Sequence, residues 1–367
     1  MKKCPYCDFN SHELKNSLEE KRYISALLQD LDQDLPKIWG RKIISIFMGG
    51  GTPSLFSPAS IDELLAGIRA RIPVSPNAEI SMEANPGTIE NHNIKGYRSA
   101  GVNRISFGVQ SFNDIHLKAL GRIHNSYSAV EAIKKAKEAN FEKINIDLMY
   151  ALPNQTLAEA YQDIQTAIEF EPTHISYYHL TIEPNTEFYL NKPILPDENS
   201  AWSISEQGKN ILSMYGYENY EVSAYAKKAF RCAHNINYWR FGDYLGIGAG
   251  AHAKITDAAL QNVTRYWKVK HPKNYLNASE DASFISGQKM LEEKELILEF
   301  LMNALRLREG VSFDTFTNNT GINITKLRNQ LTKPIQQNLI IWDEDKRWFK
   351  TSDQGNRFLD TILTEFL

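Results

Sequence analysis

The sequence has few cysteines: Cys4, Cys7 and Cys232 are the only three among 367 residues. A low, odd count excludes a disulfide-stapled secreted scaffold and indicates a reducing setting in which thiols are free for metal or redox chemistry. The sequence also lacks a signal peptide and any run of about 18 or more apolar residues. We therefore expect a cytoplasmic protein. Its net charge of −3 gives no basic excess of the kind that binds nucleic acid.

Two of the cysteines lie in one short motif, Cys4-Pro5-Tyr6-Cys7. Thiols three positions apart in a tight turn can face one metal centre or form a redox disulfide. A pair fills only half of a tetrahedral metal site, so a metal would need further ligands. The motif also resembles the active site of glutaredoxins, but that motif follows a first strand, and no strand precedes Cys4. A thiol redox protein is therefore the remote alternative.

Short apolar strands alternate with amphipathic helices along most of the chain. Alternating units of this kind, with near-continuous apolar strands, predict an α/β protein with a parallel sheet covered by helices. We expect strands at 43–48, 78–83, 102–108, 143–149 and 173–180, and helices at about 17–35, 89–100, 126–139, 156–170 and 200–215.

Glycines and unusual polar residues follow these strands at their carboxyl ends. In open α/β sheets and β/α barrels this edge is where ligands bind. The glycines offer bare backbone N–H groups, the carboxyl and amide groups can bind hydroxyls or an amine, and an arginine can pair with a carboxylate. The sequence therefore predicts one composite site, but not its ligand. Its candidate residues are Gly50, Gly51, Thr52, Glu83, Gln110, Arg122 and Asp147.

The ordered motifs C-P-Y-C-D-F, G-G-G-T-P-S, E-A-N-P, G-V-N-R-I-S-F-G-V-Q-S and D-L-M-Y-A-L-P-x-Q-T resemble the radical SAM superfamily. More narrowly, they resemble the HemW haem chaperones, which are relatives of oxygen-independent coproporphyrinogen III oxidase. The resemblance implies a partial (β/α)6 barrel, here without its first strand, and a small C-terminal winged-helix-like domain. It also implies a [4Fe–4S] cluster and S-adenosylmethionine as cofactors.

The resemblance further implies roles for individual residues. Cys4 and Cys7 would bind the cluster, whose fourth iron is left open for the amino and carboxylate groups of S-adenosylmethionine. Gly50, Gly51 and Thr52 would meet its amino group. The full set implied to lie at this cofactor is Tyr6, Gly50, Gly51, Thr52, Glu83, Gln110, Arg122 and Asp147.

The sequence departs from the family pattern C-x-x-x-C-x-x-C at its first cysteine. That cysteine is expected four residues before Cys4, immediately ahead of Met1. We expect a start placed at an internal methionine, or a trimmed sequence, rather than a member that has lost its cluster. Phe9 stands where the oxidase relatives carry a further cysteine, which favours the HemW-like branch over the oxidase.

The β/α rhythm, which we assign to a barrel over 1–225, stops in a connecting segment, 226–285. This segment contains H-N-x-x-Y-W, beginning at His234, a motif that the resemblance associates with haem binding. An imidazole beside two aromatic rings can serve as an axial ligand and a stacking wall for a porphyrin. Without the family context, such a histidine is more often a hydrogen-bonded core residue. Cys232 is the second candidate haem ligand.

The last part of the chain, 286–367, has the pattern of a small separate domain. Helices are expected near 298–305, 312–318 and 323–337, and a hairpin is expected from 339–342 and 347–350. A single final helix is expected after the hairpin, up to Leu367. This order resembles a winged helix. The charges are balanced and the hairpin tip is acidic, so a lid or partner-docking role is favoured over DNA binding.

These observations favour a cytoplasmic chaperone that binds haem and passes it to an acceptor protein, with the cluster and S-adenosylmethionine in a structural or regulatory role. The implied partners are haem, an unidentified acceptor whose membrane association is left open, and an electron donor such as a flavodoxin. The first alternative is an oxidase-type enzyme that decarboxylates porphyrinogen propionates.

Overall fold

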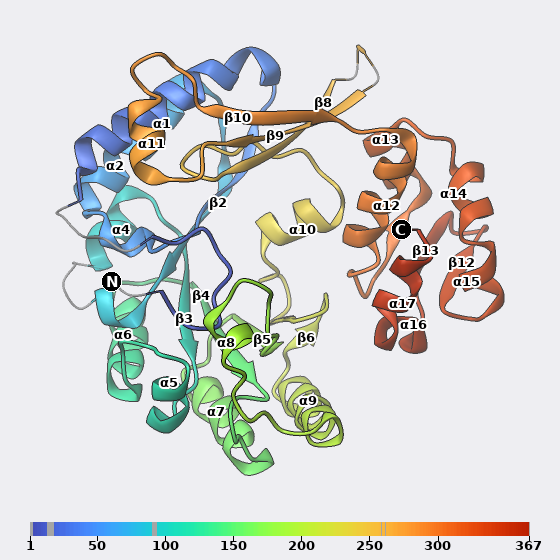
Figure 1. Ribbon diagram of the computed structural model, residues 1–367, viewed down its shortest axis with the longest axis horizontal. Helices are drawn as coiled ribbons and strands as arrows, with labels where there is room; N and C mark the ends of the chain where they lie inside the picture. The colour runs from blue at the N-terminus through green and yellow to red at the C-terminus, as the bar shows by residue number, and fades with distance from the viewer. Residues whose placement is uncertain (1–2, 13–17, 90–93, 258, 261, 367) are drawn as a thin grey trace. The chain divides into compact units, whose positions relative to one another are not determined.

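In a computed structural model, residues 3–12, 18–89, 94–257, 259–260 and 262–366 are described. The chain forms two compact units (Figure 1). The first unit comprises Met1–Leu28, Lys42–Asn219 and Ser223–Arg231, and the second comprises Gln29–Arg41, Tyr220–Val222 and Cys232–Leu367. None of the helices in the described part of the chain combines the length and the apolar character that crossing a lipid bilayer requires.

The first unit is built on a curled sheet in which the described strands follow the order β1-β2-β3-β4-β5-β7-β6. The first five are parallel, β7 is antiparallel to β5, and β6 is antiparallel to β7. Their bounds are β1 Ile43–Met48, β2 Val74–Ala84, β3 Arg104–Gln110, β4 Lys143–Tyr150, β5 His174–His179, β6 Glu218–Asn219 and β7 Ala224–Ala226. The predicted partial barrel is confirmed, whereas the antiparallel end of the sheet was not foreseen.

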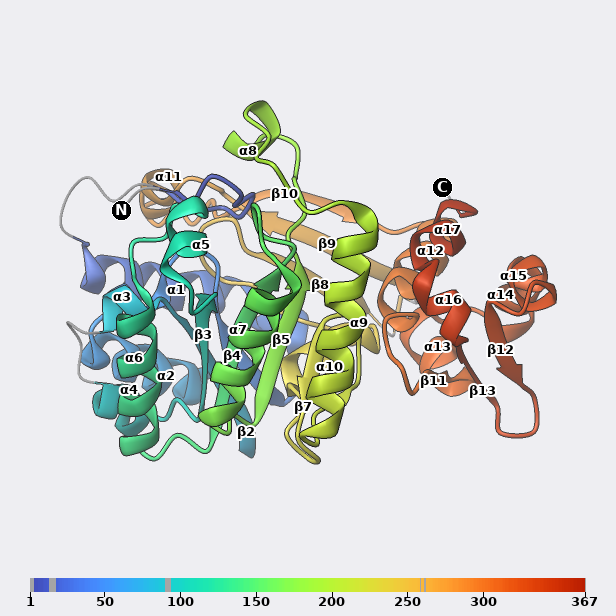
Figure 2. The same ribbon diagram turned by 90° about the horizontal axis from the view of Figure 1, so that it is seen from below.

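Helices cover the outer face of this sheet (Figures 1 and 2). The helices that cover it include α2 Pro58–Arg71, α4 Ile94–Ala100, α6 Ser126–Glu138, α7 Leu157–Glu169 and α9 Glu198–Met214. The other helices in this part of the chain are α1 Glu20–Asp34, α3 Pro86–Ile89, α5 Asp114–Ala119 and α8 Glu187–Leu190. The helix predicted at 89–100 corresponds to α3 and α4, and residues 90–93 lie outside the described part of the chain. The first residue of the helix predicted at 17–35 also lies outside it.

Local sequence sets where several of these helices begin. Thr156 caps α7 by accepting the N–H of Glu159, and the Glu159 carboxylate accepts the N–H of Thr156 in return. Ser57, Asn125 and Asp197 cap α2, α6 and α9 through single side-chain oxygens. These caps fix the helices that follow the strands, and with them the loops at the carboxyl edge of the sheet.

The core of the first unit lies between the sheet and these helices. Strand β3 contributes Phe107 and Val109, and α6 contributes Ala132 and Ile133, all fully buried. The alanines bring α6 close to β3, so that apolar surface is removed from water at about 25 cal/mol per Å². This packing fixes the strand ends that carry the polar residues.

The second unit contains an antiparallel sheet in the order β10-β9-β8, which the sequence did not predict. Its strands are β8 His252–Asp257, β9 Asn262–Lys268 and β10 Ile285–Met290, and the unit also contains α10 Ala233–Trp239 and α11 Pro272–Asn277. Lys254 and Lys268 lie on these strands and are almost completely buried. Lysine ordinarily marks a solvated face, so these two residues interrupt the apolar pattern from which the strands could have been predicted.

The C-terminal part of the second unit packs helices against a small antiparallel sheet in the order β11-β13-β12. The elements are α12 Glu293–Ala304, β11 Val311–Ser312, α13 Phe313–Thr320, α14 Ile324–Gln330, α15 Thr332–Gln336, β12 Ile340–Asp343, β13 Trp348–Thr351, α16 Asp353–Arg357 and α17 Leu359–Thr364. The predicted hairpin and the winged-helix-like order are present. The single predicted final helix is instead two short helices separated by Phe358.

Candidate functional site

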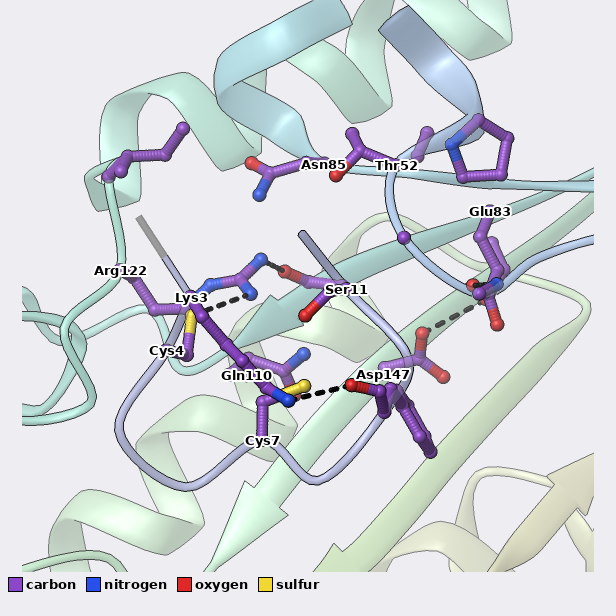
Figure 3. Close-up of a pocket in the computed structure, with 18 of the residues that line it drawn as sticks. Lys3, Cys4, Cys7, Ser11, Thr52, Glu83, Asn85, Gln110, Arg122 and Asp147 are labelled. Carbon is purple, nitrogen blue, oxygen red and sulfur yellow. Dashed lines mark hydrogen bonds between the residues drawn. The ribbon is translucent and has the colours of Figure 1, made fainter. Parts of the chain in front are cut away.

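The predicted rim residues of the first unit line one pocket of about 430 Å³ (Figure 3). They come from loops and strand ends that are far apart in the sequence but meet because parallel strands end at the same edge. The sequence therefore identified one contiguous site. The predicted residues in its lining are Cys4, Tyr6, Cys7, Gly50, Gly51, Thr52, Glu83, Gln110, Arg122 and Asp147.

The two cysteines of the pocket lie on a short turn. The N–H of Cys7 donates to the carbonyl of Cys4 at 3.1 Å, and the ammonium of Lys3 donates to the carbonyl of Phe9 at 2.8 Å. Both thiols are half-buried. Within the described residues, no group of three or more His, Cys, Asp or Glu side chains is arranged to hold a metal ion. The turn therefore presents two thiols at the pocket.

The glycine loop follows β1 and crosses the end of β2. The N–H of Gly50 donates to the carboxylate of Glu83 at 3.1 Å, and Gly50 has a φ of 109°. A Cβ added at Gly49 would lie 2.4 Å from the Phe47 ring and 3.0 Å from Cδ of Glu83. Glycine is therefore required where the loop passes over these side chains. Gly50, Gly51 and Thr52 of this loop line the pocket.

Two carboxyl groups face the same space. Asp147 accepts hydrogen bonds from Ser106 at 3.0 Å and from the amide of Asn145 at 2.7 Å. Burial raises the pKa of Asp147. Burial and, next, the charge of Asp147 raise the pKa of Glu83 to about 7, against the opposing effect of the Gly50 N–H. A cationic group placed here would relieve this repulsion, which suits the pocket to an amine or a similar cation.

The raised pKa of Glu83 predicts a pH-dependent stability. Its folded-state pKa of about 7 exceeds the ordinary value of 4.5, so its contribution is present below pH 4.5 and is lost as the pH rises through about 7. We expect Glu83→Gln to raise the free energy of unfolding at pH 8 by on the order of 2 kcal/mol for this half-buried group, and therefore to unfold at a higher urea concentration than the wild type. This advantage should disappear near pH 4.5.

The matched control is Glu63→Gln on the exposed side of α2. It removes the same charge from the surface and should leave the pH profile of unfolding unchanged. Equal urea midpoints for Glu83→Gln and the wild type at both pH values would contradict the raised pKa.

Arg122 approaches the cysteine turn from the loop after α5. One terminal nitrogen donates to the carbonyl of Gly108 at 2.7 Å, and the other donates to Sγ of Cys4 at 3.7 Å. Its Nε is buried and has no hydrogen-bond partner among the described residues. An unpaired buried donor is costly, so this guanidinium is suited to an anionic group in the pocket such as a carboxylate.

Gln110 ends β3 in a left-handed conformation, with a φ of 71°. Its side-chain oxygen accepts the hydroxyl hydrogen of Tyr178 at 2.7 Å. Asp163 on α7 stabilises the following residues, since it accepts from the hydroxyl of Ser111 at 2.7 Å and from the N–H of Phe112 at 2.6 Å. The strand end is therefore fixed so that Gln110 faces the pocket.

Sequence reasoning missed several lining residues, among them Ser106, Ser176 and Tyr178. Ser106 lies two and four positions before Gly108 and Gln110 on β3, and Ser176 pairs with Asp147 across to β5. Residues two apart on a strand share a face. The period-two spacing around the predicted residues was therefore the available signal.

His234 lies on α10 in the second unit. Its ring is 4.8 Å from that of Tyr238 in an edge-on arrangement, and Tyr238 in turn lies 4.3 Å from Tyr244. Cys232 precedes the helix as a buried thiol, with Sγ 3.5 Å from the side-chain oxygen of Asn235. The i, i+4 spacing of a helix thus places the imidazole against Tyr238, whereas Tyr244 lies outside the motif and the motif's second aromatic ring, Trp239, lies 6.5 Å from the Tyr238 ring.

Comparison with known proteins gives the family. The model of the Radical SAM superfamily matches residues 1–167, and that of the HemN C-terminal domain matches residues 291–353. The heme chaperone HemW of Haemophilus influenzae is 49% identical, over 100% of this chain and 95% of its own length. The heme chaperone HemW of Escherichia coli is 45% identical over the same shares. The chain belongs to the HemW family of radical SAM proteins.

The fold of this HemW family member agrees with a solved relative. Coproporphyrinogen III oxidase (HemN) from Escherichia coli superposes with a TM-score of 0.81 at 22% identity, covering 100% of this chain and 87% of the other. At this identity the likeness shows the fold alone. The resemblance drawn from the ordered motifs is confirmed at the level of the family and the architecture.

Proposed function

We propose that this HemW family member binds haem and transfers it to an acceptor protein, on a radical SAM scaffold that holds a [4Fe–4S] cluster and S-adenosylmethionine. The observation that carries the proposal is the identity of 49% and 45%, over the whole chain, to two proteins named heme chaperone HemW. The radical SAM family match supports the two cofactors. An electron donor such as a flavodoxin would serve the cluster.

The residues of the first unit suit these cofactors. Cys4 and Cys7 would hold the cluster together with a further ligand that the described residues do not provide beside them. The cluster, when bound, supplies an electron and an open iron for the methionine moiety. The Gly50–Thr52 loop would meet the amino group near the Glu83 carboxylate, while the unpaired Nε of Arg122 would donate to the carboxylate. Tyr6, Gln110 and Asp147 complete the lining.

The haem ligand we propose is His234, in the second unit. Its imidazole is half-buried at the edge of the Tyr238 ring, and Tyr238 packs on Tyr244. A neutral imidazole can ligate haem iron, and aromatic faces can stack on the porphyrin. Burial raises the pKa of Tyr238, so that its hydroxyl stays neutral beside an apolar ligand.

A haem titration tests this function. The anaerobically reconstituted chain is expected to bind one haem saturably, with a Soret band that His234→Ala shifts. We expect the substitution to weaken affinity by at least about ten-fold, or ~1.4 kcal/mol, because the axial ligand is lost. The control is His252→Ala, another histidine with an aromatic neighbour in the same unit, 6.4 Å from the Trp267 ring, which should bind haem as the wild type does.

The other outcomes separate the alternatives. Binding that is unchanged in His234→Ala would keep the function and move the ligand, with Cys232→Ala measured next. Absence of haem binding by a reconstituted chain that carries one cysteine added directly before Met1, together with its anaerobic conversion of coproporphyrinogen III to protoporphyrinogen, would replace the chaperone by an oxidase-type enzyme.

A further inference from the structure

The segment after β5 contacts the cysteine turn directly. It runs from Leu180 to Leu195 and contains the short helix α8, which rises on its own loop beyond the end of β5 (Figure 2). The N–H of Phe188 on α8 donates to the carbonyl of Pro5 at 2.9 Å. Pro5 lies between Cys4 and Cys7, so this hydrogen bond joins α8 to the backbone that carries both thiols.

The Phe188 side chain reinforces this contact. It is 8% exposed and belongs to a buried cluster with Leu120, Met149, Leu152 and Leu180. Its ring centroid lies 6.4 Å from that of Tyr6, the residue between the thiols, at an interplanar angle of 46°. Tilted rings at this separation attract each other beyond their buried area. The cysteine turn therefore packs against this buried apolar cluster through the side chain of Tyr6.

A second element confines the turn at Pro5. Gly121 has a φ of 64°, and a Cβ added there would lie 2.7 Å from Cδ of Pro5. The carbonyl of Gly121 lies 4.0 Å from Sγ of Cys4. The turn is therefore held between the loop after α5 and α8. Its own internal hydrogen bonds do not supply this restraint, because they join only residues of the turn to one another.

The segment itself is fixed at several points. Thr186 caps α8 by accepting the N–H of Tyr189 at 3.2 Å, and its hydroxyl donates to the carbonyl of Glu183 at 2.7 Å. Farther along, the N–H of Asn154 donates to the carbonyl of Ile194 at 3.0 Å. By contrast, Leu190 at the end of α8 is 79% exposed. One face of the segment is thus anchored, and the other faces solvent.

We propose that Phe188 is a positioning residue for the two thiols: α8 clamps the Cys4–Cys7 turn at the pocket through the Phe188–Pro5 hydrogen bond and the Phe188–Tyr6 ring contact. The proposal deepens the proposed function, on which it rests, since a cluster can be held only when both thiols face the pocket. It assigns to the segment 180–195 a role that the family motifs, which end before it, do not include.

The test measures thiol reactivity in the full chain, reduced and without cofactors. Alkylation by iodoacetamide is followed at each cysteine by mass spectrometry. Phe188→Ala removes the ring contact with Tyr6 but keeps the backbone N–H that donates to Pro5. We expect it to raise the rates at Cys4 and Cys7 about five-fold, because a loosened turn exposes its thiols more often. The matched control, Leu190→Ala on the exposed face of the same helix, should leave both rates unchanged.

Cys232 belongs to the second unit and is only 3% exposed, so its alkylation rate serves as an internal reference. A rise confined to Cys4 and Cys7 supports the clamp, whereas unchanged rates at both in Phe188→Ala overturn it. If Cys232 also becomes reactive, the chain has opened globally, and Thr186→Ala decides instead. That substitution loosens α8 without touching the turn, and it must raise the Cys4 and Cys7 rates alone for the clamp to stand.

The haem titration of the same variants keeps this inference separate from the proposed function. If the wild-type chain binds haem, but Phe188→Ala leaves the alkylation rates of Cys4 and Cys7 unchanged, the clamp is rejected and the chaperone function stands. A chain that binds no haem, with thiols released by Phe188→Ala, would keep the clamp and remove the chaperone.

Discussion

Lys268→Met is expected to lower the free energy of unfolding by about 3–5 kcal/mol. The Lys268 ammonium and the carboxylates of Asp30 and Asp34 are all completely inaccessible to solvent. Lys268 donates to Asp34 at 2.7 Å and also binds Asp30. Removing the cation would leave two buried carboxyl groups without it, which costs more than the intact ion pair contributes.

The remaining partners of Asp30 cannot replace the lysine, whereas Asp34 keeps an ion pair with Lys37. Asp30 keeps the hydroxyl of Tyr275 at 2.7 Å and the N–H of Gly248 at 3.1 Å, and both of these donors are neutral. Burial already raises the pKa of Asp30 against the opposing charge of Lys268. Without Lys268 that pKa rises further, so the variant loses stability as the pH rises and recovers part of it as the carboxyl becomes protonated at low pH.

The measurement is urea unfolding, followed by tryptophan fluorescence, at pH 8 and at about pH 5. We expect a large defect in Lys268→Met at the higher pH and a smaller one at the lower pH. Lys270→Met, two residues along the chain at an exposed position, is the control and should stay within about 0.5 kcal/mol of the wild type. If Lys268→Met also changed the free energy of unfolding by no more than about 0.5 kcal/mol, the buried carboxylates would not depend on this cation.

The same lysine explains why part of the fold was hidden in the sequence. Lys268 ends β9 and Lys254 lies within β8, and their partners Asp30 and Asp243 lie elsewhere in the chain. A strand pattern is recognised from its own residues, and a lysine in it indicates a solvated face. Burial here depends on a distant carboxylate, so no local pattern could predict the β8–β10 sheet.

The rim of the first unit was predictable for the opposite reason. Strands β1 to β4 are apolar and run directly into glycine or polar residues, and each such change marks a carboxyl end by itself. Parallel pairing then brings Glu83, Gln110 and Asp147 to one edge without further information. The segment with α8 was not predicted, because what it contacts is settled only by packing.

The motif at His234 falls between these cases. Its residue types pointed to a porphyrin through the family resemblance, but α10 was not predicted as a helix. None of its residues is fully buried, so its sequence carries no apolar stripe with helical period. There the residue types suggested a chemistry, which stays a prediction, without predicting the helix that carries it.

Cys7→Ala is expected to abolish cluster binding completely, which makes it the largest effect on the cofactors. Three thiolates bind a [4Fe–4S] cluster in the family motif, and only Cys4 and Cys7 lie together among the described residues. One cysteine added directly before Met1 completes the spacing C-x-x-x-C-x-x-C with them. We therefore expect this extended chain to retain more iron and sulfide than the chain Met1–Leu367 after anaerobic reconstitution and desalting.

Within the extended chain, Cys7→Ala leaves two thiols, which fill too few iron sites to retain the cluster against a chelator. Iron and sulfide should fall to the level of an unreconstituted sample, and the broad visible absorption of the cluster should disappear. Cys232→Ala is the matched control: it also removes one thiol, but from a site in the other unit, and the cluster should remain. Retention of iron by Cys7→Ala, or its loss in Cys232→Ala alone, would contradict the assignment of the turn as the cluster site. If both variants keep the cluster, its ligands lie elsewhere in the chain, and the pocket beside Cys4 and Cys7 is not the cluster site.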